Sequence, residues 1–262
     1  MPYPTIIGAI AGDIIGSRFE WNRIKTTDFE LFHSGCDFTD DSVMTFAVAQ
    51  GVLEDKPFGP LMHAFGRAYT GRGYGGNFRR WLESDDPQPY GSFGNGSAMR
   101  VSPAGFACNT LEETLEMARQ TALPSHNHPE GIKGAQATAG AMFLARTGSS
   151  KKEIAEYIIH TFGYDLSRSI AEIRPGYYFD ETCQLTVPPA IQAFLESSDY
   201  ESAIRLAISL GGDSDTLACI TGGLAAAYYR HIPQEILDFA YDILPSELAA
   251  ISQTFDGAVW GG

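Results

Sequence analysis

Apolar residues recur at spacings of three and four along most of the chain, and this periodicity constrains the fold more than any other feature. Such spacing places apolar side chains on one face of an α-helix, whereas a half-buried strand alternates apolar and polar residues. No convincing alternation occurs in the sequence. The pattern predicts helices over residues 6–15, 41–53, 61–69, 111–122, 129–146, 151–162, 188–196, 200–209, 213–230, 233–241 and 245–252.

The chain is expected to form one all-α domain over residues 1–262, a compact orthogonal multi-helix bundle. Its 262 residues, 44% of them hydrophobic, are enough for a sizeable core, and no linker-like composition divides them. The stretches 136–142 and 218–227 are rich in Ala and Gly. Because small side chains let helices approach closely, these two stretches should lie at the centre of the bundle.

The charge balance excludes some classes of partner. Lys and Arg number 18 against 32 Asp and Glu, for a net charge of -14, and no basic run occurs. Binding to nucleic acid through a basic surface is therefore not expected. No apolar run approaches the roughly 18 residues of a membrane span, and Asp13 interrupts an N-terminus that lacks a basic start. We expect a cytoplasmic protein with reduced cysteines, no membrane partner and, by default, a monomeric state.

Residues 70–103 are crowded with glycine and show little regular pattern. Long irregular segments in compact domains are usually functional. The part that reads GSFGNGSAM, residues 91–99, offers many backbone N–H groups, which can hold phosphates without cationic side chains. It matches neither the P-loop nor the Rossmann fingerprint. A tight-turn loop is the alternative interpretation.

Two short acidic clusters each precede a predicted helix: TDDS at 39–42 and GGDSDT at 211–216. Helix capping by Thr39 or Asp213 would explain one side-chain oxygen per helix. Each cluster instead supplies two carboxylates and a threonine hydroxyl. If the clusters meet in space, their repulsion calls for divalent cations, and hard oxygen ligands favour Mg²⁺, Mn²⁺ or Ca²⁺ over zinc. The spacing alone does not show that they meet.

Three further positions have more than one interpretation. Asp13 interrupts an apolar helix and is interpreted as a buried hydrogen-bond partner. Glu20 lies just past the end of the same helix, where it is either a surface residue or a ligand or general base. His126 belongs to the segment SHNHPE, and we expect it to stack on or hydrogen-bond to a ligand rather than to bind metal.

Seven stretches, in order from about residue 6 to residue 229, resemble the ADP-ribosylglycohydrolase family, of the dinitrogenase-reductase-activating glycohydrolase and ADP-ribosyl-acceptor hydrolase type. They are GAIAGDIIGSRFEW, TDDSVMTFAVA, RGYGGNF, GSFGNGSAMRVSPAG, SHNHPEGIKGA, TVPPAI and SLGGDSDTLACITGGLAAAYY. The pair TDDS and GGDSDT, with GNGSAMR between them, is highly specific.

The resemblance implies an all-α fold with two Mg²⁺ or Mn²⁺ ions in a central cleft. The metal ligands it implies are Thr39, Asp40, Asp41, Asp213, Asp215 and Thr216, with Asp215 bridging the ions. The catalytic residues would be Glu20, Asp41 and Asp215, with Glu20 on a mobile segment. The substrate-binding residues would be Ser92, Phe93, Gly94, Asn95, Gly96, Ser97, Met99 and His126.

The reaction implied by the resemblance is hydrolysis of the C1″ bond between ADP-ribose and an acceptor, including ADP-ribosylated protein. Members that act on ADP-ribosylated arginine often carry an acid-containing motif where this chain has Gly73-Tyr74-Gly75-Gly76, so an O-linked, serine-type substrate is favoured. Two alternatives stay open: a non-catalytic ADP-ribose-binding protein and a two-metal nucleotide phosphoesterase. The intact set of acidic residues argues for catalysis.

Overall fold

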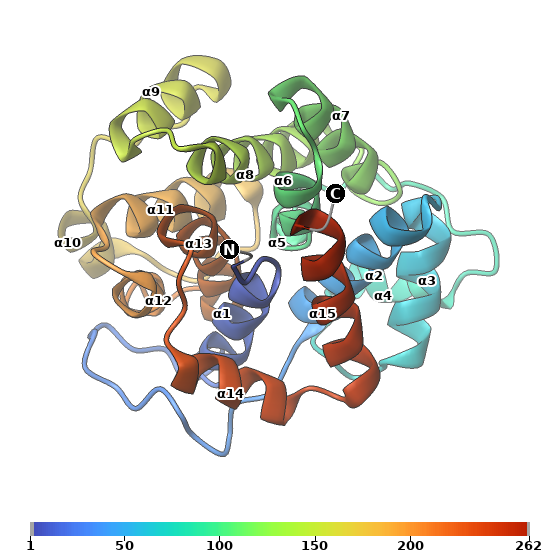
Figure 1. The fold of residues 1–262 in the computed structure, drawn as a ribbon, viewed down its shortest axis with the longest axis horizontal. Coiled ribbons are helices and arrows are strands. Elements are labelled where there is room, and N and C mark those ends of the chain that lie inside the picture. The colour runs from blue at the N-terminus through green and yellow to red at the C-terminus, as the bar shows by residue number, and fades with distance from the viewer. Residues whose placement is uncertain (1–2, 261–262) are drawn as a thin grey trace.

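The computed structural model describes residues 3–260 and is built from helices joined by loops (Figure 1). The helices are α1 (Ile7–Ser17), α2 (Asp40–Glu54), α3 (Phe58–Ala68), α4 (Gly76–Glu83), α5 (Gly96–Met99), α6 (Ser102–Ala107), α7 (Leu111–Ala122), α8 (Pro129–Thr147), α9 (Lys151–Phe162), α10 (Ile170–Ile173), the 3₁₀ turn η1 (Arg174–Gly176), α11 (Cys183–Glu196), α12 (Tyr200–Ile208), α13 (Ser214–Tyr229), α14 (Gln234–Ile243) and α15 (Ser246–Trp260). Among these residues the one β-type pairing is an isolated bridge between Gly94 and Thr182. The all-α prediction is confirmed.

Helix α13 lies at the centre of the bundle, as its content of small residues predicts. Every side chain from Ser214 to Ala227 is buried, and α1 packs along much of its length (Figure 1). The two helices come so close that a Cβ at Gly12 would overlap the backbone carbonyl oxygen of Ala218. A Cβ at Gly16 would lie 2.7 Å from the Cα of Asp215. Glycine on α1 therefore sets the position of the first turn of α13.

Helix α1 also holds the start of α2, through Asp13. This carboxylate is fully buried and accepts the backbone N–H groups of Thr39 at 3.0 Å and Ser42 at 3.1 Å. It also accepts the hydroxyl of Thr39 at 2.7 Å and that of Ser42. The interpretation of Asp13 as a buried hydrogen-bond partner is confirmed. One helix thus fixes the first turns of both α2 and α13.

The predicted helix over residues 188–196 begins too late, because α11 starts at Cys183 and carries Pro188 and Pro189 in its interior. Proline has no N–H, so Pro189 leaves the carbonyl of Leu185 without its helical partner. The Tyr177 hydroxyl donates to that carbonyl at 2.8 Å. A contact from outside the helix thus replaces a missing backbone hydrogen bond, which no local pattern signals.

The glycine-crowded segment 70–103 is less irregular than its sequence suggests. It contains α4 and α5, and α6 begins at its end. In α4, the side chains of Phe78, Trp81 and Leu82 are buried on one face, the spacing typical of a helix. The flanking glycines hide this short period in the sequence.

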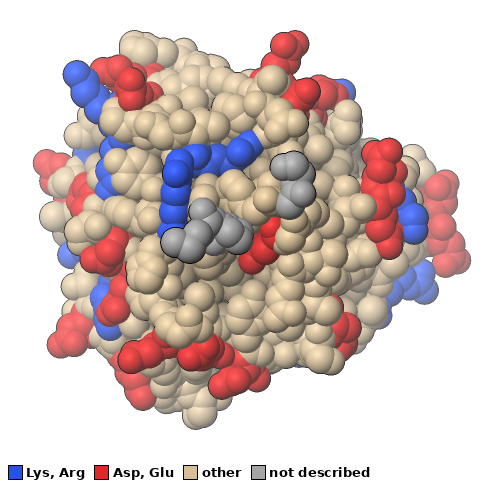
Figure 2. Space-filling model, viewed as in Figure 1, with Lys and Arg blue, Asp and Glu red and all other residues tan. Residues whose placement is uncertain are grey.

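The surface agrees with the charge pattern. On the face shown in Figure 2, acidic side chains are spread around the edge and basic ones lie singly or in short rows. None of the helices within residues 3–260 has the length and apolar character needed to cross a membrane.

Candidate active site

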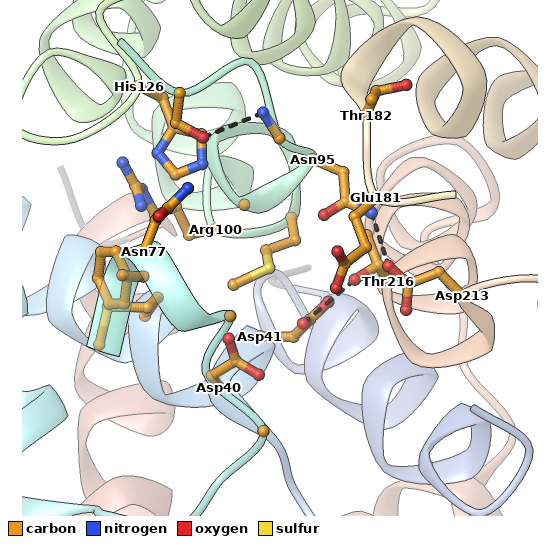
Figure 3. A pocket seen from close by; sticks show the side chains of 18 of the residues that line it. Asp40, Asp41, Asn77, Asn95, Arg100, His126, Glu181, Thr182, Asp213 and Thr216 are labelled. Atoms are coloured by element: carbon orange, nitrogen blue, oxygen red, sulfur yellow. Dashed lines mark hydrogen bonds between the residues drawn. The ribbon is translucent and has the colours of Figure 1, made fainter. Parts of the chain in front are cut away.

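One cavity of about 490 Å³ brings together residues from distant parts of the chain (Figure 3). It lies between the first turns of α2 and α13, the loop after α1, the glycine-rich segment and residues 181–182. The predicted site residues that line it are Glu20, Asp40, Asp41, Ser92, Phe93, Gly94, Asn95, Gly96, Met99, His126, Asp213, Asp215 and Thr216.

The two acidic clusters meet at this cavity, which the sequence alone could not establish. The hydroxyl of Thr216 on α13 donates to Asp41 Oδ2 on α2 at 3.3 Å. Glu20, Asp213 and Asp215 each place a carboxylate oxygen within 4.8 Å of those of the other two. Gly211, which precedes the second cluster, has a φ of 64°, a left-handed conformation that glycine adopts without strain.

Helix capping accounts for only one of these acidic motifs. Thr39 caps α2, because its hydroxyl oxygen accepts the N–H of Asp41 at 3.2 Å. Asp213 occupies the equivalent position before α13, but its side chain accepts no capping hydrogen bond. Its Oδ2 accepts instead from the Asn95 amide at 2.7 Å. The glycine-rich segment is therefore joined to the second cluster.

Burial and mutual repulsion raise the pKa of every carboxyl group in the cluster. Burial is the largest cause, and neighbouring carboxylates add to it, with Asp215 the main one for Asp40 and Asp41. The pKa values of Asp40, Asp41 and Asp215 lie well above the ordinary range for aspartate. Burial and the nearby acids raise the pKa of Asp213 to about 6 and that of Glu20, on the loop after α1, to about 8.

These residues fit a hard divalent cation. Asp41 is 2% exposed, and its Oδ1 atom is buried without a hydrogen-bond partner among the described residues. Of the residues that line the cavity, Arg100 is the one Lys or Arg, and it carries no ion pair to the cluster. The donors are carboxylate and hydroxyl oxygens, which Mg²⁺, Mn²⁺ and Ca²⁺ prefer.

The glycine-rich segment is fixed along one side by the chain just before α11. The N–H of Asn95 donates to the carbonyl of Glu181 at 2.6 Å, and the N–H of Cys183 donates to the carbonyl of Phe93 at 3.0 Å. Phe93 is 44% exposed and lies beside His128, with ring centroids 5.2 Å apart. An apolar ring thus stands exposed at the cavity beside a segment rich in backbone donors.

Two predicted site residues do not line the cavity. The hydroxyl of Ser97 donates to the carbonyl of Gly131 at 2.7 Å and is fully buried. Thr39 uses its hydroxyl to donate to Asp13 and to cap α2. Both side chains are engaged in holding the local structure.

The cavity also contains residues that sequence reasoning missed: Met44, Asn77, Phe78, Tyr90, Arg100, Glu181 and Thr182. Two of them carry a signal that could have been noticed. Arg100 is a lone basic residue in the apolar run AMRV, and Glu181 is the second acid of a pair before α11. The others have no distinctive local pattern, because only the fold brings them to the cavity.

The fold is helical, and its cavity gathers carboxylates from the first turns of two helices that are distant in the sequence. These features are those of a helical protein with an acidic, cation-binding type of site. The family model of ADP-ribosylglycohydrolases then matches residues 3–256, and the chain belongs to that family.

Comparison with individual proteins agrees with this assignment. Human ADP-ribosylhydrolase ARH3 is 26% identical over 86% of this chain and 84% of its own length. ADP-ribosylarginine hydrolase Tri1 of Pseudomonas putida (strain GB-1) is 28% identical over 86% of this chain and 69% of its own. A solved structure titled ADP-ribosylglycohydrolase-related protein complex superimposes with a TM-score of 0.75 at 25% identity, covering 97% of this chain and 96% of that one.

Proposed function

We propose that the protein is a metal-dependent hydrolase that cleaves the bond between C1″ of ADP-ribose and an oxygen-linked acceptor. The observation that carries the proposal is the contact between Thr216 and Asp41, which joins the two acidic clusters in one cavity. Membership of the ADP-ribosylglycohydrolase family supports the class of reaction.

The proposed cofactor is a pair of Mg²⁺ or Mn²⁺ ions. The residues that would hold them are those of the two clusters whose side chains line the cavity: Asp40, Asp41, Asp213, Asp215 and Thr216. Thr39 would act indirectly, by capping α2. When bound, such ions supply positive charge and Lewis acidity at the reacting centre. The unpartnered Oδ1 of Asp41 supports the assignment, because a buried carboxylate oxygen without a partner is costly unless a ligand completes it.

Residues of the chain would stabilise charge on the ribose, transfer the proton and bind the rest of the substrate. As the bond at C1″ breaks, positive charge develops on the ribose ring, and the carboxylates of Asp41 and Asp215 stabilise it. Glu20, half-buried on the loop after α1 and lining the cavity, would take the proton from the attacking water. Ser92 to Gly96, Met99 and His126 would hold the rest of the ADP-ribose.

An oxygen-linked acceptor is favoured by the wall of the cavity next to Asp40. That wall is formed by Gly73, Gly75 and Gly76, so this segment adds no acid to those of the proposed metal site that could pair with a guanidinium leaving group. The similarity to ARH3 and to an arginine hydrolase is comparable, so sequence identity does not choose between the acceptors.

The acceptor preference is tested by measuring the release of free ADP-ribose from three compounds: an ADP-ribosyl-serine peptide, ADP-ribosyl-arginine and O-acetyl-ADP-ribose. We expect release from the oxygen-linked compounds and little from ADP-ribosyl-arginine. Preference for arginine would overturn the acceptor assignment. Release of AMP or phosphate would favour a nucleotide phosphoesterase, and tight binding of ADP-ribose without any product would favour a binding protein.

A further inference from the structure

A buried arginine at the cavity wall has no acidic partner. Arg100, at the end of α5, is 1% exposed and forms no ion pair among residues 3–260. Its Nη2 donates to the carbonyl of Thr121 at 2.9 Å and to Ser125 Oγ at 3.0 Å, while its Nε is buried without a partner. Burying a guanidinium without an acidic partner is costly, so a compensating role for Arg100 is expected.

Arg100 is connected through Ser125 to His126. Ser125 is fully buried just after α7, and its Oγ lies 2.8 Å from His126 Nδ1. A guanidinium N–H can only donate, so Ser125 Oγ accepts from Arg100. The remaining partner of the serine hydroxyl among the described residues is His126 Nδ1. The three side chains therefore form a buried chain of hydrogen bonds that ends at the cavity.

The direction of the second hydrogen bond determines which ring nitrogen carries the proton. If Nδ1 carried it, the serine hydroxyl hydrogen would have no acceptor in a fully buried place, which is unfavourable. With the hydroxyl donating to Nδ1, the proton of the neutral ring lies on Nε2. Burial and the adjacent positive charge of Arg100 keep the pKa of His126 well below its ordinary value, so the ring stays neutral.

The Nε2 atom faces the glycine-rich segment. A Cβ added to Gly96 would lie 3.0 Å from it, and one added to Gly94 would lie 3.5 Å away. Among the described residues, the His126 ring forms its hydrogen bond through Nδ1, and Nε2 has no hydrogen-bond partner. Figure 3 shows His126 and Arg100 on the side of the cavity away from Asp213. The Nε2–H group of His126 thus faces the glycine-rich segment, where it has no hydrogen-bond acceptor among the described residues.

We propose that Arg100 and Ser125 are positioning residues that fix His126 as its Nε2–H tautomer, so that it donates a hydrogen bond to an anionic oxygen of the ligand. The inference rests on the proposed function for the identity of that oxygen, which would belong to the diphosphate of ADP-ribose. The tautomer itself is a property of the ligand-free protein. Its test is therefore independent of catalysis.

The first test is the long-range ¹H–¹⁵N spectrum of the ¹⁵N-labelled protein without ligand at neutral pH. His126→Gln assigns the ring signals among the six histidines of the chain. We expect the neutral Nε2–H pattern for His126 in the natural protein and its loss in Ser125→Ala. A neutral Nδ1–H ring or an imidazolium in the natural protein would overturn the proposal.

The second test is the affinity for ADP-ribose measured by calorimetry. Ser125→Ala should raise Kd about tenfold, the effect of losing one well-oriented hydrogen bond. The matched control is Ser102→Ala, which removes an equally buried serine hydroxyl that has no partner and lies outside the chain of hydrogen bonds. It should change neither the His126 signals nor Kd.

The outcomes separate this proposal from the proposed function. An unchanged Kd and tautomer in Ser125→Ala, or equal effects of both serine variants, would overturn the positioning role even if the hydrolase assignment stands. Failure of ADP-ribose to bind the natural protein would contradict the proposed function, while the spectrum of the ligand-free protein would still decide the tautomer.

Discussion

At the scale of single residues, the carboxylates of the cavity are held where their charges repel. Asp215 contributes to the raised pKa of Asp40, Asp41 and Glu20 alike. Asp215 itself is buried, at 4% exposed. In the absence of cations this repulsion destabilises the folded state, since the same groups in the unfolded chain are solvated and far apart. Asp215 is thus the residue at which function and stability oppose each other most clearly.

The variant Asp215→Asn should lose activity and gain stability when no metal is present. It removes a ligand from the proposed pair of ions while keeping the shape of the side chain. The free energy of unfolding of the metal-free protein should rise by at least about 1.4 kcal/mol, the equivalent of one pKa unit. Urea denaturation in EDTA measures it, with the exposed Asp85→Asn as the control. Full activity in Asp215→Asn would remove it from the site.

The variant Glu20→Gln should lower turnover far more than the affinity for ADP-ribose. Glutamine keeps the size of the side chain and its ability to hydrogen-bond, but it cannot accept a proton. General base catalysis contributes a factor on the order of 10²–10⁴, so kcat should fall by about that much. Calorimetry should give a nearly unchanged Kd. A variant that turns over at the natural rate would exclude Glu20 as the base.

At the scale of elements, α1 is the part that aligns the site, because it fixes the first turns of both α2 and α13. Asp13 holds the start of α2, and glycine allows α13 to lie against α1. The proposed metal ligands on these two helices would move apart if the close contact were lost. Stability and activity should therefore respond together to changes at this contact.

The variant Gly12→Ala should destabilise the protein by roughly 1–3 kcal/mol, because its Cβ would overlap the carbonyl of Ala218 and force the helices apart. The matched control is Gly257→Ala in α15, where a Cβ meets nothing within 4 Å. There the gain in helix propensity should stabilise the protein by up to about 1 kcal/mol. Equal changes in unfolding free energy for both variants would contradict the proposed contact.

At the scale of the whole molecule, the sequence predicts the fold class well, but it predicts contacts between residues that are distant in the sequence less well. Helical periodicity is local, so most helices could be expected from it. The early start of α11 depends on Tyr177 replacing a hydrogen bond that Pro189 cannot make, which is a tertiary effect. The acidic residues stand out because of their chemistry, whereas Met44 and Tyr90 carry no local signal and reach the cavity only through the fold. The contact between Asp41 and Thr216 likewise needs the helix packing.

The stability of the whole protein should depend on metal and on pH together. The raised pKa values of Asp213, about 6, and Glu20, about 8, mean that the folded metal-free protein holds protons that the unfolded chain releases. This contribution to stability is complete below the unfolded pKa, near 4, and is lost as the pH rises through about 6 to 8. Cations should offset the loss, since metal binding displaces these protons.

The difference in Tm between protein with saturating Mg²⁺ and protein in EDTA should therefore widen from pH 5.5 to pH 8. Differential scanning fluorimetry at both values measures it, with Asp215→Asn expected to show a smaller change. A difference that is absent or independent of pH would mean that these carboxylates bind no cation.

Metal dependence decides whether the two acidic clusters form one hydrolytic site, as proposed. The measurement that tests it most directly is release of ADP-ribose from the ADP-ribosyl-serine peptide by EDTA-treated protein, before and after titration with Mg²⁺ or Mn²⁺, beside Asp41→Asn. We predict no release without metal, recovery on titration, and no recovery in the variant. Full release in EDTA, or recovery in Asp41→Asn equal to that of the natural protein, would contradict the account.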